Sequence, residues 1–352
     1  MGNMTEPKTE NEIVDELIDL CGDKFADYRK KWDRVNAFEL ETDFPLFLHV
    51  EPNYKCNFRC PMCTQGVPEL KEKFGYSERL KTADIQNIIE QGRQAGCPSI
   101  SFQGDNEPFL IKEIPDWFAM ARDAGFIDIM VNTNGSVMTE RLAERTIASG
   151  LTRIRFSLDA ATEATYERIR LGGSFQKVHR NIARFLDLRE KLGAKLPKVG
   201  VNFVKMTSNA HEIQAFREFW SSRADYVVIQ DFMTPDTEGD YSEFDVADRV
   251  AAPEFRCQQP WQRLYIRGNG DVTPCCAMFS SYLKLGNIHM HSLKDLWHSH
   301  QAVELRKLHA EGRYRENATC LKCSKNGSPV VNSESNSKST PINFDRAGGP
   351  RY

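Results

Sequence analysis

From residue 46 onward, short apolar runs alternate with longer segments in which apolar residues recur at helical spacing. The runs have the length of buried strands, and the longer segments have the period of amphipathic helices. The predicted strands are 46–51, 99–103, 127–132, 153–158, 199–204 and 226–231. The predicted helices between them are 82–95, 114–124, 138–149, 162–169 with 175–193, and 209–222.

This alternation predicts six strand–helix repeats joined by right-handed crossovers, and therefore a parallel sheet. Six repeats are too few to close an eight-stranded barrel. The predicted fold class is α/β: a partial (β/α)6 TIM-like barrel followed by a small C-terminal Cys-rich domain. In barrels of this kind the chemistry takes place at the C-terminal ends of the strands.

The flanking segments complete a five-part organisation of the chain. Residues 1–43 carry apolar residues at helical spacing and are predicted to form a helix or helix pair packed on the barrel. The barrel covers 44–232, an acidic linker covers 233–256, and the Cys-rich module covers 257–326. The tail, 327–352, is rich in Ser, Asn, Pro and Gly and is predicted to be disordered.

The composition of the chain argues against several classes of protein. The chain has 352 residues and a net charge of −3, which gives no general attraction to nucleic acid or to an anionic membrane. It contains no apolar run of about 18 residues and no apolar signal segment at its start, so a cytoplasmic protein is expected. Ten cysteines in such a chain indicate metal or redox chemistry rather than a disulfide framework.

Three of these cysteines follow the first predicted strand in CxxxCxxC spacing: Cys56, Cys60 and Cys63. Thiolates are soft ligands that favour iron–sulfur clusters and zinc. Three thiolates can hold three irons of a [4Fe–4S] cluster and leave the fourth iron open to a substrate or cofactor. A structural zinc site takes four protein ligands, so the count favours the cluster. Three cysteines also cannot pair among themselves as disulfides.

This loop resembles the signature of the radical S-adenosylmethionine (SAM) superfamily. The resemblance implies that SAM binds the open iron, that one electron cleaves it, and that a 5′-deoxyadenosyl radical abstracts a hydrogen atom from the substrate. It also implies an external one-electron reductant such as flavodoxin or ferredoxin. The family usually has an aromatic residue before the last cysteine, where this chain has Met62. That departure changes packing beside the adenine rather than ligation.

The ends of the next strands extend the resemblance. The turn Gly104-Asp105-Asn106-Glu107-Pro108 resembles the family's Gly-Gly-Glu-Pro turn, which holds the SAM amino group, although a plain Gly/Pro turn is the alternative. The segment 168–175 resembles one whose arginine neutralises the SAM carboxylate, and the resemblance implies this role for Arg170, with Arg168 paired to solvent. A guanidinium is chemically suited to this, because it fits a carboxylate bidentately. The resemblance implies that the SAM-binding residues are Gly104, Asn106, Glu107, Pro108, Asn132, Ser157, Asp159 and Arg170.

Polar residues also end the fifth and sixth predicted strands. Asn202, Lys205, Gln230 and Asp231 would face the barrel mouth, where they are candidate substrate contacts or else ordinary loop residues. Asp231 is taken as a catalytic candidate.

A second cysteine group lies near the C-terminus. Cys257 and Cys275 flank a predicted hairpin around residues 264–271, a helix is expected at 292–309, and Cys320 and Cys323 form a CxxC knuckle. Four thiolates suit Zn(Cys)4 or a fully ligated cluster, and spacing alone does not decide between them.

The second group resembles the SPASM/twitch extension of radical SAM enzymes. The full SPASM form needs further cysteines after the CxxC knuckle, and none follows Cys323. The shortened form with a single auxiliary [4Fe–4S] cluster fits better, held by Cys257, Cys275, Cys320 and Cys323. Cys276 is left over, as a neighbour, a replacement ligand or a hydrogen-atom donor.

A closed auxiliary cluster has no site for SAM, so electron transfer is its expected role. The chain resembles the radical SAM aminocyclitol dehydrogenases, which carry one such cluster. The first hypothesis is therefore dehydrogenation of a sugar or aminocyclitol alcohol, a small-molecule substrate. The alternative within enzymes is radical epimerisation of a sugar or peptide residue, with Cys276 or Cys21 as the hydrogen donor. The non-enzyme alternative is a zinc-binding scaffold protein.

Overall fold

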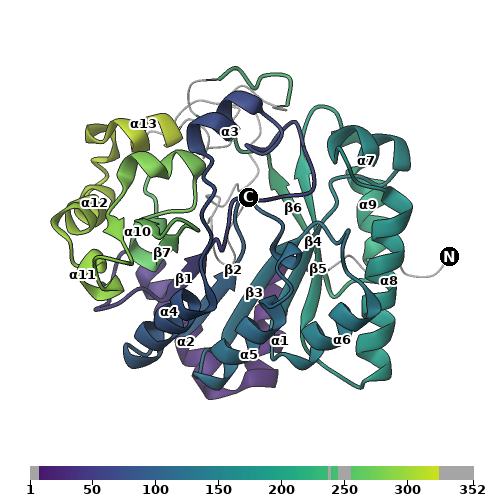
Figure 1. Cartoon of the computed structure of the whole chain (residues 1–352), viewed down its shortest axis with the longest axis horizontal. Coiled ribbons are helices and arrows are strands. Elements are labelled where there is room, and N and C mark those ends of the chain that lie inside the picture. The colour runs from purple at the N-terminus through teal and green to yellow at the C-terminus, as the bar shows by residue number, and fades with distance from the viewer. Residues whose placement is uncertain (1–7, 237–238, 245–254, 325–352) are drawn as a thin grey trace, which may run out of the picture.

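The protein is built on one nine-stranded sheet in the order β6-β5-β4-β3-β2-β1-β7-β8-β9 (Figure 1). The computed structural model describes residues 8–236, 239–244 and 255–324. Six parallel strands follow chain order along the sheet, which confirms the predicted partial barrel. They are β1 (Phe47–Val50), β2 (Ser99–Phe102), β3 (Asp128–Thr133), β4 (Arg153–Ser157), β5 (Lys198–Lys205) and β6 (Tyr226–Asp231).

The outer face of this sheet is apolar and is covered by helices. Alternate strand residues such as Leu48, Ile100 and Ile154 are fully buried there, against helix residues such as Ile88 and Phe185. Apolar side chains recur on this face with period 2, and this alternation fixes the register of the sheet. The covering helices are α4 (Thr82–Gln94), α5 (Ile114–Asp123), α6 (Glu140–Ala148), α7 (Glu163–Ile169), α8 (Phe175–Lys191) and α9 (Ile213–Trp220), with 3-10 turns at Pro108–Leu110 and Ala210–Glu212.

The N-terminal helices α1 (Glu10–Cys21) and α2 (Asp23–Asn36) close the end of the barrel where the strands begin. Trp32 of α2 packs with Phe47 and Tyr226, which are the first residues of β1 and β6. Arg153, the first residue of β4, pairs with Asp128 at 2.5 Å and with Glu10 of α1 at 3.0 Å. The N-terminal segment thus forms two helices at this end of the barrel, and the polar mouth lies at the opposite end.

The C-terminal cysteine module continues the barrel sheet. β7 (Arg263–Ile266) runs parallel to β1, with Tyr265 beside His49. β8 (Asp271–Thr273) and β9 (Gly286–Asn287) follow in antiparallel order and complete the predicted hairpin. The remaining elements are α10 (Gln259–Gln262), η3 (Met278–Leu283), α11 (Leu293–Trp297), α12 (His300–Ala310), η4 (Tyr314–Glu316) and α13 (Ala318–Ser324).

Two details differ from the sequence-based expectation. The single helix expected at 292–309 is two helices, because the Ser299 hydroxyl caps a new start by accepting the Ala302 N–H at 3.3 Å. A short helix, α3 (Pro68–Phe74), follows the first cysteine loop and was not predicted. Among the helices that the structure describes, none is long and apolar enough to cross a membrane.

Part of the predicted linker packs on the barrel. Within residues 233–236 and 239–244, Tyr241 lies beside Phe232, and the Phe244 carbonyl accepts the Thr207 N–H at 3.2 Å. Lys73 of α3 pairs with Asp236 at 3.5 Å. The tail predicted at 327–352 lies outside the described residues.

Candidate active site

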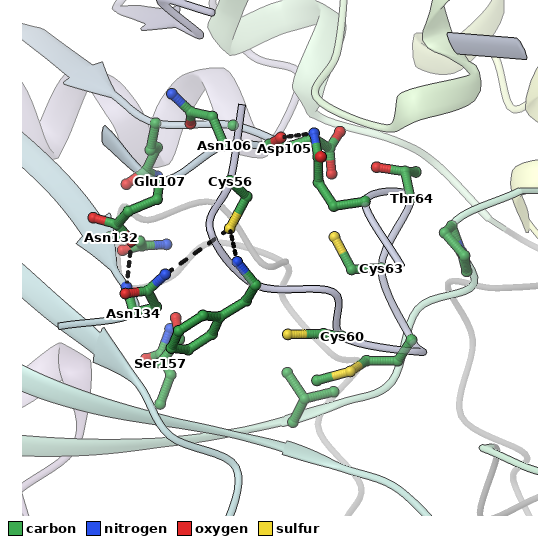
Figure 2. Close-up of a pocket in the computed structure, with 18 of the residues that line it drawn as sticks. Cys56, Cys60, Cys63, Thr64, Asp105, Asn106, Glu107, Asn132, Asn134 and Ser157 are labelled. Atoms are coloured by element: carbon green, nitrogen blue, oxygen red, sulfur yellow. Dashed lines mark hydrogen bonds between the residues drawn. The ribbon is translucent and has the colours of Figure 1, made fainter. Parts of the chain in front are cut away.

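The first cysteine loop leaves β1 and lies over the barrel mouth. Figure 2 shows the sulfur atoms of Cys56, Cys60 and Cys63 turned toward one open space. The Cys56 Sγ accepts the Phe58 N–H at 3.4 Å, and the Cys60 Sγ lies 3.9 Å from an Arg170 Nη1. The three thiols are therefore presented from one loop to one cavity, as their spacing predicted.

The loop backbone is fixed by tight turns. The Cys60 carbonyl accepts the Cys63 N–H at 3.0 Å, and the Cys63 carbonyl accepts the Gly66 N–H at 2.9 Å. A Cβ on Gly66 would lie 2.0 Å from the Cys60 oxygen, so only glycine fits there. These backbone bonds leave the thiols free to act as ligands.

The donor set suits a cluster. Burial raises the pKa of Cys56 to about 11 and also raises the pKa of Cys60 and Cys63. Buried thiolates need positive charge close by, which iron supplies. Within the part of the chain that the structure describes, no three His, Cys, Asp or Glu side chains are arranged around a single metal ion. His49 adds no fourth ligand, because it is buried in the barrel with its Nε2 2.9 Å from the Gln103 carbonyl.

Glu107 ties the end of β2 to the end of β3. Its Oε1 accepts the Thr133 hydroxyl at 2.6 Å, and its Oε2 accepts the Asn134 N–H at 2.7 Å. Burial raises the pKa of Glu107 to about 7, against these bonds, which favour the carboxylate. Asn134 in turn donates to Asn57 at 3.0 Å and lies 3.9 Å from Cys56. Glu107 therefore shapes the wall beside the cysteine loop.

Asp159 aims Arg170 at the cavity. Asp159 has a left-handed backbone (φ 61°), and its Oδ1 accepts the Val204 N–H at 2.8 Å. Its Oδ2 lies 2.5 Å from Arg170 Nη2. The Arg170 Nε is buried and has no hydrogen-bond partner among the described residues, so it remains available to an anionic ligand group. The neighbouring Arg168 is exposed and donates to the Ser208 carbonyl at 3.1 Å.

Most of the predicted site residues line one cavity. Pro108 lies just outside it, buried at the start of a 3-10 turn. The cavity also contains Gln103, Asp105 and Asn134, which the sequence analysis did not single out. The predicted residues in its lining are Cys56, Cys60, Cys63, Gly104, Asn106, Glu107, Asn132, Ser157, Asp159, Arg170, Asn202 and Cys276.

The structure does not bring Asp231 or Cys21 to this cavity. On β6 the inner-face positions include Tyr226 and Gln230, and strand alternation turns Asp231 to the other face. There Asp231 is exposed and pairs with Lys205 at 2.6 Å. Cys21 ends α1 at the closed end of the barrel, which excludes it as a hydrogen donor at the mouth.

The second thiol group gathers at the end of β8 and on α13. Burial raises the pKa of Cys275 and Cys323 well above the ordinary value, and the charges of the neighbouring thiols raise it further. The charges of Cys257 and Cys320 act on both of these thiols, so the four predicted ligands lie together. Four thiols with no open position suit a closed cluster.

Cys276 lies between the two thiol groups. It is buried, lines the main cavity, and acts electrostatically on Cys275 and Cys323. Its Sγ–H and its N–H both donate to Gln259 Oε1, each at 3.1 Å. No other cysteine of the second group lines the main cavity among the described residues.

Family comparison agrees with this arrangement. The model of the radical SAM superfamily matches residues 50–212. The chain therefore contains a radical SAM domain. A model of the SPASM iron–sulfur cluster-binding domain matches residues 257–324. A radical SAM protein of this composition uses SAM, one [4Fe–4S] cluster and at least one further iron–sulfur cluster, as the two cysteine groups predicted.

Solved structures share this radical SAM fold. BtrN in complex with AdoMet and 2-DOIA is 19% identical, covers 80% of this chain and 93% of its own, and has a TM-score of 0.51. The structure of anSMEcpe with bound AdoMet is 16% identical, covers 80% of this chain and 85% of its own, and has a TM-score of 0.59. The structure of Streptococcus suis SuiB bound to precursor peptide SuiA is 16% identical, covers 88% of this chain and 76% of its own, and has a TM-score of 0.63. Likeness at these identities concerns the fold.

Curated relatives match only part of the radical SAM chain. A probable GTP 3′,8-cyclase of Methanococcus maripaludis is 26% identical over 196 residues, which are 54% of this chain and 60% of the relative. The GTP 3′,8-cyclase of Desulforamulus reducens is 30% identical over 171 residues, 48% of this chain and 50% of the relative. The chain thus spans between half and three-fifths of these relatives' length.

Proposed function

We propose that this radical SAM protein is an oxidoreductase that converts a carbinol of a sugar or aminocyclitol to a ketone. The observation that carries the proposal is a single closed group of four thiols, joined through Cys276 to the cavity that holds the open group of three. A closed cluster beside the substrate is suited to accepting an electron rather than to binding SAM.

The chain's own residues supply ligation and orientation. Cys56, Cys60 and Cys63 would hold the first cluster, and Cys257, Cys275, Cys320 and Cys323 the second. When bound, SAM and the first cluster supply hydrogen-atom abstraction, and the second cluster supplies an acceptor for the remaining electron. The polar groups of Asn132 and Ser157, at the ends of β3 and β4, line the same cavity and would orient SAM.

Arg170 and Glu107 have complementary roles in this proposal. Arg170 would offer its Nε to the SAM carboxylate, while its Nη2 is held by Asp159. Glu107 acts mainly through the Thr133–Asn134 segment, which it anchors.

The comparisons agree with a small-molecule substrate but do not distinguish it from a peptide. BtrN, a structural neighbour, is named in complex with AdoMet and 2-DOIA, whereas SuiB is named with a peptide. Radical SAM enzymes act on small molecules or on peptides and need an external reductant. We propose a small-molecule alcohol, with flavodoxin or ferredoxin as the electron donor.

A second candidate is radical epimerisation, because the buried Cys276 thiol lines the cavity. The thiol would return a hydrogen atom to the opposite face of the substrate carbon, and one electron from the external reductant and a proton would restore the thiol from the thiyl radical left on Cys276. Cys276→Ser should then abolish formation of the epimer, while Cys97→Ser should not. Cys97 is the matched control because it is buried, lies at the start of β2, and donates to the Ser99 carbonyl at 3.5 Å.

The test is anaerobic turnover with SAM, dithionite and polyols or aminocyclitols in two arms: substrate deuterated at the carbinol carbon in H2O, and undeuterated substrate in D2O. Dehydrogenation predicts substrate deuterium in 5′-deoxyadenosine and a product that has lost the two carbinol hydrogens. Epimerisation predicts a product that carries solvent deuterium at that carbon. No transfer of substrate deuterium from any alcohol tested would refute the proposal.

A further inference from the structure

A carboxylate behind the cavity wall holds the turn that follows β2. Glu51 is the first residue after β1, is fully buried, and is not among the described residues that line the cavity. Its Oε2 accepts the Asp105 backbone N–H at 2.6 Å. A Cβ on Gly104 would lie 2.2 Å from the same oxygen, so the turn rests directly on the carboxylate. Glu51 therefore fixes the backbone of the turn that the family resemblance assigns to the SAM amino group.

The same carboxylate is held from the C-terminal cysteine module. The Tyr265 hydroxyl, on β7, donates to Glu51 Oε2 at 2.6 Å. The Tyr76 hydroxyl, after α3, donates to Glu51 Oε1 and accepts the Gly268 N–H of the β7–β8 turn at 2.8 Å. Glu51 is thus tied to the hairpin that leads to Cys275.

Arg267 extends this connection to the second thiol group. It follows β7 and is buried, with its Nη1 3.9 Å from Glu51 Oε1. Burial alone would lower the pKa of Arg267, but the charge of Glu51 outweighs burial and raises it. The Arg267 Nη2 donates to the Ala277 carbonyl at 3.4 Å, and Ala277 lines the cavity beside Cys276. The network therefore runs behind the wall, from the turn after β2 to the loop after β8.

The chemistry of a carboxylate makes this connection strict. An ionised carboxylate only accepts hydrogen bonds, and Glu51 accepts them from three segments: the Asp105 N–H and the hydroxyls of Tyr76 and Tyr265. If one segment moves, a buried donor is left unpaired and the desolvation cost is not recovered. The position of the turn is thus coupled to the position of the cysteine module.

We propose that Glu51 is a positioning residue for SAM, and that Tyr265 and Arg267 couple it to the C-terminal cysteine module. Glu51 acts through the backbone of the turn rather than by touching SAM. Side chains of the module that lie outside the cavity lining should therefore change SAM affinity. The inference depends on the SAM-binding turn and not on the substrate, so it is tested separately from the dehydrogenation.

Equilibrium binding of SAM to the anaerobically reconstituted protein tests the role of Glu51. Glu51→Gln keeps the shape but leaves one acceptor oxygen for three donors and removes the charge. SAM should bind about five- to thirtyfold more weakly. Iron content and the reduced-cluster signal should match those of the wild type, which separates positioning from failed assembly.

Tyr226→Phe is the matched control for these measurements. It also removes a buried aromatic hydroxyl, but at the closed end of the barrel, where Tyr226 packs in the apolar cluster around Trp32. Its SAM affinity should stay within about twofold of the wild type.

Tyr265→Phe tests the link to the module with a smaller change. It removes one hydroxyl outside the cavity lining, and SAM should bind about two- to fivefold more weakly. Both changes act on one carboxylate, so the double variant Glu51→Gln/Tyr265→Phe should bind SAM within about twofold of Glu51→Gln. Losses that multiply would show that Tyr265 acts by another route and would overturn the coupling.

Hydrogen–deuterium exchange of single amides, without SAM, gives a readout that needs no turnover. The Asp105 amide should exchange about tenfold faster in Glu51→Gln and faster to a smaller degree in Tyr265→Phe. The Ile129 amide, bonded to the Thr152 hydroxyl at 2.8 Å, is the internal control and should exchange at the wild-type rate.

Two results would overturn the proposal. One is SAM affinity that is unchanged in both Glu51→Gln and Tyr265→Phe. The other is equal acceleration of the Asp105 and Ile129 amides, which would show a general loss of structure instead of a released turn. If Glu51→Gln does not assemble its clusters, Tyr265→Phe alone decides, and an unchanged SAM affinity in that variant refutes the coupling.

Discussion

Arg170 and Asp159 form a buried ion pair, with Arg170 Nη2 2.5 Å from Asp159 Oδ2 and Arg170 Nη1 3.9 Å from Cys60 Sγ. Burial raises the pKa of Asp159, and the guanidinium of Arg170 works against that rise. The pair thus stabilises a carboxylate in the wall and directs an arginine to the edge of the cysteine loop.

Removing the arginine should cost both stability and SAM binding. Arg170→Gln leaves Asp159 buried without its cation, and loss of one partner of a buried pair costs about 3–5 kcal/mol. We expect a lower melting temperature and at least about tenfold weaker SAM binding, because a charged hydrogen bond to the carboxylate is lost. Arg168→Gln is the control, since Arg168 is exposed and donates to the Ser208 carbonyl, away from the cavity lining. Equal losses in the two variants would contradict the assignment.

Gly66→Ala should damage the first cluster selectively. The added Cβ would lie 2.0 Å from the Cys60 oxygen, so the loop between Cys60 and Gly66 must move. Overpacking of this kind costs about 1–3 kcal/mol and displaces the thiols. We expect about half of the iron to be lost, with the second cluster retained as an internal standard. Iron analysis and electron paramagnetic resonance measure this, and an unchanged reduced-cluster signal with normal SAM cleavage would be the opposing result.

His309 predicts a pH dependence of stability. Its Nδ1 accepts the Cys257 N–H at 3.1 Å, and burial lowers its pKa to about 4. Below the unfolded pKa of about 6.5 the unfolded chain takes up a proton that the folded chain does not, so acid removes stability. The stability difference between wild type and His309→Gln should shrink by about 2 kcal/mol from about pH 7.5 to about pH 5.

The measurement is thermal or denaturant unfolding of the reconstituted protein at several pH values. His211→Gln is the control, because the His211 side chain is 68% exposed, and its difference from wild type should be flat. A flat difference for His309→Gln as well would show that the histidine is not held in its neutral form.

The strands of the barrel could be predicted because each one alternates or is wholly apolar between turn signals. β5 and β6 begin and end within a residue of the predicted limits. The parallel pairing of β1 with β7 could not be predicted, because residues so far apart in the chain leave no local signal of their contact. α3 was missed because seven residues are too few for a helical period to stand out.

The candidate site also contains residues that could be predicted from the sequence and residues that could not. The first cysteine loop is local, so spacing alone identified its three thiols, and Figure 2 shows them facing one space. Asp231 was placed at the mouth because it ends a strand, but the phase of alternation turns it outward. Gln103 and Asp105 were missed because the fold, rather than a local motif, brings them into the lining of the cavity.

The most direct test of the account is iron, sulfide and SAM cleavage measured together after anaerobic reconstitution of wild type and of Cys56→Ala/Cys60→Ala/Cys63→Ala. Two cubane clusters predict about eight iron and eight sulfide in the wild type and about four of each in the variant. Only the wild type should then cleave SAM in the presence of dithionite. Reductive SAM cleavage by the triple variant, or a wild type that holds zinc and no iron, would contradict the account.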